Sequence, residues 1–191
     1  MRNSLNCVMV AGLSVLGMGG CLMNESAADP TSGSATEALS GTAVADPISA
    51  AAGNFHQIKN RAFDQCISAP NGALNVVLKL ADCNDSDTTQ GWAFVATSSP
   101  GVFNIVNQNS GFCMEVNNGT SNPGERVDEF HCNGTTAELW AQSFRVIDGV
   151  AYQQYTHSGT NQCLDTVSGR GSQLMQFNCG AGNDAQTWLV Q

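Results

Sequence analysis

From about residue 55 onward, hydrophobic and polar residues alternate in short runs, and each run is followed by turn-forming residues. Glycine, asparagine and serine are frequent between the runs, and no amphipathic helix is predicted after residue 53. Short alternating runs with turn signals every ~8–12 residues are typical of all-β proteins. The predicted strands form three sets, at 55–58, 66–68 and 76–80, at 103–106, 113–115 and 127–130, and at 152–155, 163–165 and 174–177.

The same succession of signals occurs three times along the chain. Trp92, Trp140 and Trp188 stand at equal intervals, and six cysteines fall in the same register, two to a repeat. One repeat cannot bury its own apolar face, so three units are expected to pack around a pseudo-threefold axis with the tryptophans in the core. A propeller would need about four blades or more. The repeats span about 55–101, 102–149 and 150–191.

The residues just before the tryptophans carry a further signal. Gln90-Gly91-Trp92 and Gln186-Thr187-Trp188 resemble the QxW signature of ricin B-type lectins, and Glu138-Leu139-Trp140 differs from it by one residue. The resemblance covers residues 53–191 and implies an all-β fold, the β-trefoil, as one carbohydrate-binding domain. Gln90 and Gln186 are expected to hydrogen-bond to nearby backbone, because buried polar groups need partners.

The cysteines of each repeat are expected to form one disulfide. This pairing follows from the repeat register alone, since six cysteines allow fifteen connectivities. A metal site is the alternative, but these cysteines lack the close spacing of zinc ligands. The predicted disulfides are Cys66–Cys83, Cys113–Cys132 and Cys163–Cys179.

The resemblance also implies one potential saccharide pocket per repeat. In the family, an aspartate two residues after the first cysteine accepts hydrogen bonds from the sugar, and an aromatic residue two before the second cysteine stacks on it. Asp165 and Phe177 occupy these positions in the third repeat, which is the main expected site. An alanine replaces the usual asparagine before the tryptophan, so Asn183 and Asp184 are expected to substitute for it from the loop. Gln186 is expected to support the strand that contains Trp188, beside this pocket.

The second repeat matches the family pattern in part and is a weaker expected site. Glu115 replaces the aspartate and is longer by one methylene, and Phe130 supplies the ring. Asp128 takes the polar position four before the second cysteine, and Asn133 follows that cysteine. A solvated acidic edge is favoured over a calcium site here. The first repeat is expected to bind no sugar, because its corresponding residues are Ser68, Lys79 and Ala81.

The N-terminal fifty residues differ in composition from the repeats. A basic start, an apolar run at 5–18 and small residues ahead of Cys21 resemble a bacterial lipobox, so residues 1–21 are predicted to be a secretory signal with Cys21 lipidated. Ordinary cleavage after Ala28 is the alternative. Residues 22–52 hold no aromatic residue, lysine or arginine and are predicted to be a flexible linker. The expected location is therefore secreted or cell-envelope, as an outer-membrane lipoprotein of a bacterium if Cys21 is lipidated.

Charge and motifs argue against several function classes. Seven Lys and Arg against sixteen Asp and Glu give a net charge of −9, whereas phosphate binding needs a basic surface, so no nucleic-acid partner is expected. The sequence has no phosphate-binding loop and no metal motif, and its three histidines, which have no evident serine or cysteine partner, are expected at the surface. Catalysis and a cofactor are therefore not expected.

Together these features predict a monomeric, non-catalytic carbohydrate-binding module. Its ligand is expected to be a galactose-type sugar or a plant or microbial polysaccharide, bound mainly through the third repeat. Any membrane contact is expected to run through the lipid anchor. The alternative is a β-trefoil that contacts or inhibits another protein and has degenerate sugar pockets.

Overall fold

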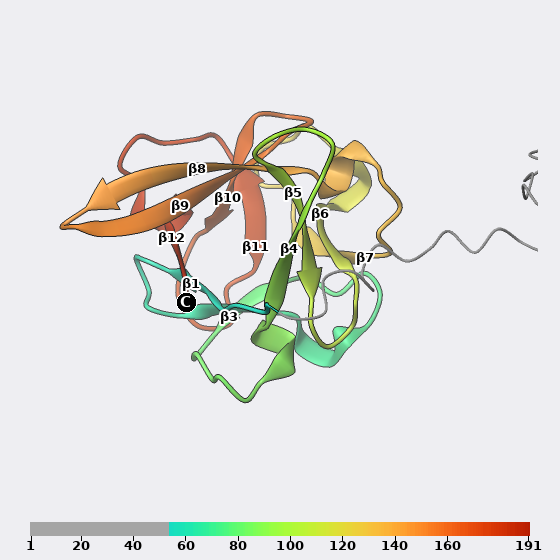
Figure 1. The fold of residues 1–191 in the computed structure, drawn as a ribbon, viewed down its shortest axis with the longest axis horizontal. Helices are drawn as coiled ribbons and strands as arrows, with labels where there is room; N and C mark the ends of the chain where they lie inside the picture. The colour runs from blue at the N-terminus through green and yellow to red at the C-terminus, as the bar shows by residue number, and fades with distance from the viewer. Residues whose placement is uncertain (1–53) are drawn as a thin grey trace, which may run out of the picture. The chain divides into compact units, whose positions relative to one another are not determined.

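The computed structural model describes residues 54–191, so the predicted signal, Cys21 and the linker at 22–52 lie outside the described residues. Twelve strands, four per repeat, form the domain (Figure 1). Short 3-10 turns connect them, and they include η4 (Asn117–Gly119), η5 (Thr136–Glu138) and η6 (Asp184–Gln186). The strands are β1 (Ile58–Asn60), β2 (Cys66–Ser68), β3 (Lys79–Ala81), β4 (Trp92–Ala96), β5 (Val102–Asn107), β6 (Cys113–Val116), β7 (Val127–Phe130), β8 (Trp140–Ile147), β9 (Val150–His157), β10 (Gln162–Thr166), β11 (Leu174–Phe177) and β12 (Trp188–Val190).

Six of the strands close a barrel. Antiparallel pairing runs from β1 to β12, then to β9, β8, β5 and β4 in turn. A bridge between His56 and Trp92 joins the end of this series back to the segment that leads into β1. Closure leaves no unpaired barrel edge that could recruit another strand.

The other six strands form three hairpins, β2–β3, β6–β7 and β10–β11, one from each repeat. Isolated bridges link each hairpin to the next around the axis: Val77 to Asp128, Lys79 to Gln173, and Arg126 to Met175. A barrel with a triangular cap of hairpins is a β-trefoil, and the predicted fold class is confirmed.

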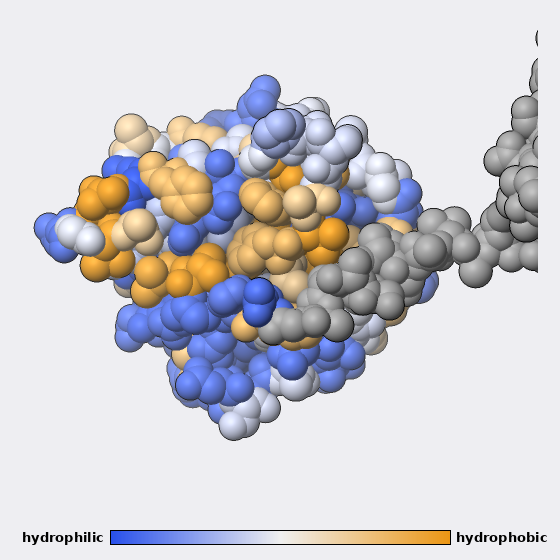
Figure 2. Space-filling view, in the orientation of Figure 1, coloured by the Kyte–Doolittle hydropathy of each residue, from blue (hydrophilic) through white to orange (hydrophobic). Residues whose placement is uncertain are grey.

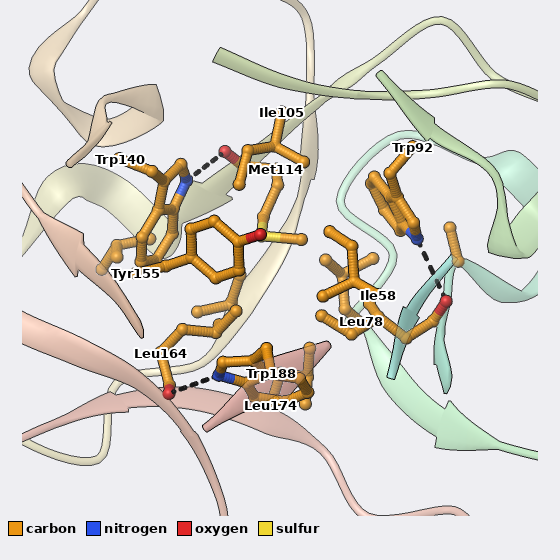
Figure 3. Packing of buried hydrophobic residues seen from close by; sticks show 14 of the residues in the cluster. Ile58, Leu78, Trp92, Ile105, Met114, Trp140, Tyr155, Leu164, Leu174 and Trp188 are labelled. Atoms are coloured by element: carbon orange, nitrogen blue, oxygen red, sulfur yellow. Dashed lines mark hydrogen bonds between the residues drawn. The ribbon is translucent and has the colours of Figure 1, made fainter. Parts of the chain in front are cut away.

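The three tryptophans hold each barrel strand against the hairpin of the same repeat (Figure 3). All three are fully buried, together with the aliphatic residues around them. Each indole N–H donates to the backbone carbonyl of the residue that follows the first cysteine. The distances are 3.1 Å from Trp92 Nε1 to Ile67 O, 2.9 Å from Trp140 Nε1 to Met114 O, and 3.3 Å from Trp188 Nε1 to Leu164 O.

The glutamine or glutamate two residues before each tryptophan bonds to the loop after the second cysteine. Its side-chain Oε1 accepts from the backbone amide of the residue that follows this cysteine. In the first and third repeats its Nε2 also donates to the backbone carbonyl of the residue that precedes the same cysteine. The prediction for Gln90 and Gln186 is thereby confirmed. The accepting distances are 2.9 Å for Gln90 and Asn84 N, 2.7 Å for Glu138 and Asn133 N, and 2.8 Å for Gln186 and Gly180 N.

The disulfides pair as the repeat register predicts. Their Cα–Cα distances are 5.0 Å for Cys66–Cys83, 5.1 Å for Cys113–Cys132 and 5.0 Å for Cys163–Cys179. Each one closes the loop that carries a hairpin of the cap. Restricting three loops of the unfolded chain stabilises a domain with few charges and short strands.

Two predictions about the strands and histidines were wrong in detail. The first strand begins at Ile58 and not at residue 55, because residues 55–57 pair only through His56 with Trp92 and Gln57 with Gln191. His157 was expected at the surface but is fully buried. Its ring nitrogens lie 2.9 Å from Thr136 O and 2.9 Å from Thr160 Oγ1, and burial lowers its pKa. These partners come from distant turns that no local pattern reveals.

The β8–β9 hairpin is longer than its counterparts and extends away from the rest of the domain (Figure 1). Its two-residue turn, Asp148 and Gly149, has positive φ at both positions, as a tight antiparallel hairpin requires. Figure 2 shows hydrophobic side chains gathered toward its end, where Phe144 and Val146 are 64% and 75% exposed. Within residues 54–191, no helix is long and apolar enough to cross a bilayer.

Trp140→Phe should destabilise the domain by about 1–3 kcal/mol, because Met114 O loses its buried donor and a small cavity forms. Urea unfolding followed by circular dichroism measures the change. Phe144→Thr, at an exposed hairpin position, is the control and should change stability by less than about 0.5 kcal/mol. Equal effects of the two substitutions would contradict the anchoring role of the indole.

Candidate functional site

The register of each cap hairpin explains why the family spacing places an acid next to a ring. In the second repeat Cys113 pairs with Phe130 and Glu115 pairs with Asp128, so all four share one face of the hairpin. The third repeat has the same arrangement, with Cys163 opposite Phe177 and Asp165 opposite Met175. Successive residues of a strand point to opposite faces, so residues two apart return to the same one. The acid and the ring therefore lie diagonally across one surface.

The second repeat forms a cavity of about 350 Å³ between its hairpin and two 3-10 turns, η4 and η5. We call it the second-repeat pocket. Three of the four residues predicted for this site, Glu115, Phe130 and Asn133, line it together. The complete lining is Asn75, Glu115, Asn117, Asn118, Gly119, Phe130, Asn133, Thr135, Thr136 and Ala137.

Glu115 supplies the carboxylate of this pocket. The residue is only 6% exposed, and no hydrogen bond to a described residue stabilises its charge. Burial, followed by the charges of Asp128 and Glu138, raises the pKa of Glu115 to about 7. The carboxylate thus has its hydrogen-bonding capacity free for a ligand in the cavity.

Asp128, the fourth predicted residue, lies outside the lining. It is fully buried, and its Oδ2 accepts from Asn117 Nδ2 at 3.0 Å and from Arg126 Nε at 3.1 Å. Burial raises its pKa, although Asn117 and Arg126 oppose the shift. Asp128 therefore positions Asn117 at the pocket wall and contributes negative charge beside Glu115, its cross-strand partner.

The carboxylate of Asp165, the expected main acid of the third repeat, already accepts hydrogen bonds from two other residues of the protein. It is 7% exposed, its Oδ1 accepts from Thr166 N at 2.6 Å, and its Oδ2 accepts from Gln186 Nε2 at 2.7 Å. The ring of Phe177 on the same hairpin face is 42% exposed. A carboxylate has about four acceptor positions, so two remain for a ligand.

The two loop residues predicted to complete the third site have other partners. Asn183 begins the turn η6, and its Oδ1 accepts from Ala185 N at 3.0 Å. Asp184 forms an ion pair with Arg61, whose guanidinium lies 5.6 Å from the centroid of the Tyr152 ring. The structure thus brings Asp165 and Gln186 into contact, whereas Asn183 caps its own turn and Asp184 joins that turn to Arg61.

The first repeat departs from the pattern as expected. Ser68, at the acid position, shares a hydrogen bond of 3.0 Å with Thr89. A separate cavity of about 340 Å³ lies between residues of all three repeats, and its lining includes His56, Gln108 and Gln191. No local pattern in the sequence indicates this cavity. A Cβ at Gly91 would lie 2.2 Å from Gln108 Oε1, so a larger residue there would displace that side chain.

The asparagines and threonines of the second-repeat pocket were also missed. Asn117 and Asn118 lie in η4, Thr136 in η5 and Thr135 just before it, and these turns come together only in the folded chain. Asn118 has a φ of 55°, a left-handed conformation that asparagine tolerates better than most residues. The asparagine-glycine pair before a threonine was the local signal for this turn. No group of three or more potential metal-ligating residues occurs within 54–191.

Comparison with known protein families agrees with this geometry. A family model described as the ricin-type beta-trefoil lectin domain matches residues 101–191, and one described as ricin-type beta-trefoil lectin domain-like matches residues 46–129. The chain carries a ricin-type β-trefoil lectin domain. No curated protein matches the chain in sequence.

Solved structures resemble the lectin domain in fold. The designed threefold-symmetric protein ThreeFoil is 18% identical with a TM-score of 0.63, and the match covers 71% of this chain and 96% of that one. The Polyporus squamosus lectin, bound to a human-type influenza-binding epitope, is 13% identical with a TM-score of 0.62, over 72% and 48%. An exo-β-1,3-galactanase from Clostridium thermocellum is 18% identical with a TM-score of 0.63, over 71% and 29%. This chain thus spans less than half of the two natural proteins, and at these identities the likeness shows the fold alone.

Glu129 is a second acid in the lectin domain whose protonation is linked to folding. It is fully buried opposite Met114 on the core side of the hairpin, its Oε1 accepts from Ser110 Oγ at 2.7 Å, and its Oε2 has no partner among the described residues. Burial raises its pKa to about 7. The third repeat has Gln176 at the equivalent position, and its Nε2 donates to Thr120 O at 2.7 Å.

The free energy of unfolding should therefore fall as the pH rises from about 4.5 to about 7. In this range the unfolded carboxyl groups release their protons while the buried ones retain them, so the folded state binds more protons. Glu129→Gln, which introduces the residue found in the third repeat, should remove about 1–3 kcal/mol of this fall. Urea unfolding at pH 4.5 and pH 8 measures it. Asp148→Asn in the exposed hairpin turn is the control, and an unchanged pH dependence in Glu129→Gln would contradict the assignment.

Proposed function

We propose that this protein binds saccharides through its lectin domain and does not transform them. The second-repeat pocket is the observation that carries the proposal, because it combines a free buried carboxylate with a ring and several amide and hydroxyl groups. Such a combination suits a sugar, whose hydroxyls donate to carboxylates and whose C–H face packs on an aromatic ring. The match to lectin-domain family models supports the same conclusion.

Binding without catalysis is supported by the number of acids in contact with the pocket. Glycoside hydrolysis needs two carboxyl groups on either side of the scissile bond, about 5–10 Å apart. Glu115 is the one carboxylate in the lining of the second-repeat pocket, because Asp128 and Glu138 are not part of it. A ligand there meets an acceptor but no second group placed for attack or proton transfer.

The third repeat contributes a second saccharide site in this proposal. Asp165 and Phe177 have the relative position of Glu115 and Phe130, and the Phe177 ring is open to solvent. Asp165 has fewer free acceptor positions than Glu115, so we rank the third site below the second and reverse the order expected from the sequence. A galactose-containing ligand is supported by the fold likeness to a galactanase and to a lectin with a galactose-containing epitope.

The location of the protein is proposed on two grounds. Three disulfides are consistent with an oxidising extracellular compartment. Lipidation of Cys21 remains a prediction from the sequence, and we propose with it that residues 22–52 tether the lectin domain to a membrane.

A protein-interaction role is the second candidate function, and one observation favours it. The β8–β9 hairpin exposes Phe144, Val146 and Val150, an apolar surface unrelated to the predicted sugar positions. Exposed apolar residues that cluster often mark an interaction site. Saccharide binding and a protein contact at this hairpin would use different surfaces.

A glycan array probed with the full-length protein tests the saccharide function. We expect signals for galactose-containing glycans. Glu115→Ala and Phe130→Ala should each weaken them by about 10–100-fold, because a charge-assisted hydrogen bond contributes about 1.5–3 kcal/mol. Asp165→Ala and Phe177→Ala should give a smaller loss.

The control for this experiment is Asp148→Asn, which neutralises a carboxylate in the turn of the β8–β9 hairpin and should leave the signals unchanged. A reversed order of losses would restore the third repeat as the main site. An array without any saccharide signal would exclude the proposed function and favour the protein-interaction role.

A further inference from the structure

We propose that the second-repeat pocket prefers a saccharide with a protonated amino group, a hexosamine, over the matching neutral sugar. The inference rests on the proposed function, since it names the class of sugar for the same pocket. Its basis is the Glu115 carboxylate, which has no hydrogen-bond partner among the described residues, and the glutamate at position 138, where the third repeat has Gln186.

In the third repeat, the acid of the site is paired with an amide. Gln186 donates from Nε2 to Asp165 Oδ2 at 2.7 Å and to Asn178 O at 2.9 Å, while its Oε1 accepts from Gly180 N. The glutamine therefore does two things at once: it secures the loop after the second cysteine and it satisfies the carboxylate of the pocket.

In the second repeat, glutamate replaces this glutamine. Glu138 still secures its loop, because Oε1 accepts from Asn133 N at 2.7 Å and Oε2 accepts from Gly134 N at 3.2 Å. An ionised carboxylate has no N–H to donate, so it cannot satisfy Glu115 as Gln186 satisfies Asp165. The carboxylate–amide pair of the third repeat has thus become two neighbouring acids, whose charges repel each other when both are ionised.

Among the described residues, no positively charged side chain lies inside the pocket to compensate for the charge of Glu115 and Glu138. The lining contains no lysine, arginine or histidine. Arg126, just before β7, has its Nε ion-paired with Asp128 Oδ2 at 3.1 Å. His131 is exposed at the rim, where its ring centroid lies 5.7 Å from that of Phe130. Asp128 from β7 and Glu138 from η5 are the acids that face Glu115, so its surroundings are predominantly negative.

A ligand ammonium group would supply the missing partner. It would form a charge-assisted hydrogen bond with Glu115 and reduce the repulsion among the three acids, which a neutral hydroxyl does only weakly. The Phe130 ring at the same pocket can contact the sugar's C–H face or the cation itself. The amide and hydroxyl groups of the lining remain available for the sugar hydroxyls.

Isothermal titration of the full-length protein at pH 7 tests this, with galactosamine against N-acetylgalactosamine and glucosamine against N-acetylglucosamine. In whichever of the two pairs binds more tightly, the hexosamine should bind about tenfold more tightly than its N-acetyl form. Glu138→Gln introduces the amide of the third repeat and should bring this ratio close to one, because it should weaken hexosamine binding more than neutral-sugar binding. Raising the salt concentration from 50 to 500 mM should also lower the ratio, by about threefold, because the preference is electrostatic.

Two further variants complete the design. Glu115→Gln removes the partner of the ammonium group and should also abolish the preference, which gives a second reading if Glu138→Gln fails to fold. Asp148→Asn, which removes a surface charge in the β8–β9 turn, should keep the wild-type ratio.

The outcomes separate this inference from the function on which it rests. A ratio of one in the wild type, with neutral sugars still bound through Glu115 and Phe130, overturns the hexosamine preference and leaves the lectin function standing. Absence of binding by all four sugars overturns both. If the wild type binds calcium ions without any sugar and Glu115→Gln does not, the pocket belongs to a metal ion and the inference is overturned.

Discussion

The hydrogen bond from each tryptophan indole to the hairpin of its own repeat is the contact on which the rest of the domain depends. It joins the last strand of a repeat to the residue after the first cysteine, and so it connects the barrel with the cap. The disulfide holds the same end of this hairpin, because its first cysteine directly precedes the residue that the indole binds. Strands of only three to five residues, such as β2 and β4, could not maintain this geometry alone. The position of the pocket residues is a consequence, because the acid comes one residue after the carbonyl that the indole binds.

The pseudo-threefold repetition separates what supports the fold from what determines binding. Positions that point inward keep the same function in all three repeats: the tryptophan, the carbonyl that it binds, and the side chain that accepts from the loop after the second cysteine. Positions that point outward differ. Serine, glutamate and aspartate stand at the acid position in turn, and alanine replaces phenylalanine in the first repeat. The first repeat therefore completes the barrel and cap without needing a sugar pocket, which is why its Ser68 could pair with Thr89.

Much of this architecture could be predicted from the sequence, because repeats report long-range contacts through their period. Equal tryptophan intervals, cysteine register and the QxW residues were enough for the fold class, the disulfides and the facing of Glu115 and Phe130. Other features depend on contacts between repeats that no period encodes. The burial of His157 requires Thr136 from the preceding repeat, and the ion pair of Asp184 requires Arg61 from the far end of the domain. The proposed ranking of the two sites depends on such contacts as well. Asp165 matched the family residue more closely than Glu115 did, yet the number of acceptor positions left free depends on Gln186 and Glu138.

Two neighbouring acids, Glu115 and Glu138, destabilise a small domain, and nearby hydrogen bonds and ion pairs offset part of this destabilisation. Glu138 accepts two backbone amides, which partly offset its burial, and Arg126 does the same for Asp128. Glu115 has no such compensation, although Glu138→Gln would provide it with a single substitution and the third repeat already has that arrangement. Simple selection for stability would favour glutamine at position 138. Glutamate there makes physical sense if the missing partner of Glu115 arrives with the ligand, because the free energy lost in the empty pocket is then recovered on binding. The least satisfied group in the second repeat is thus also the group best placed to discriminate between ligands.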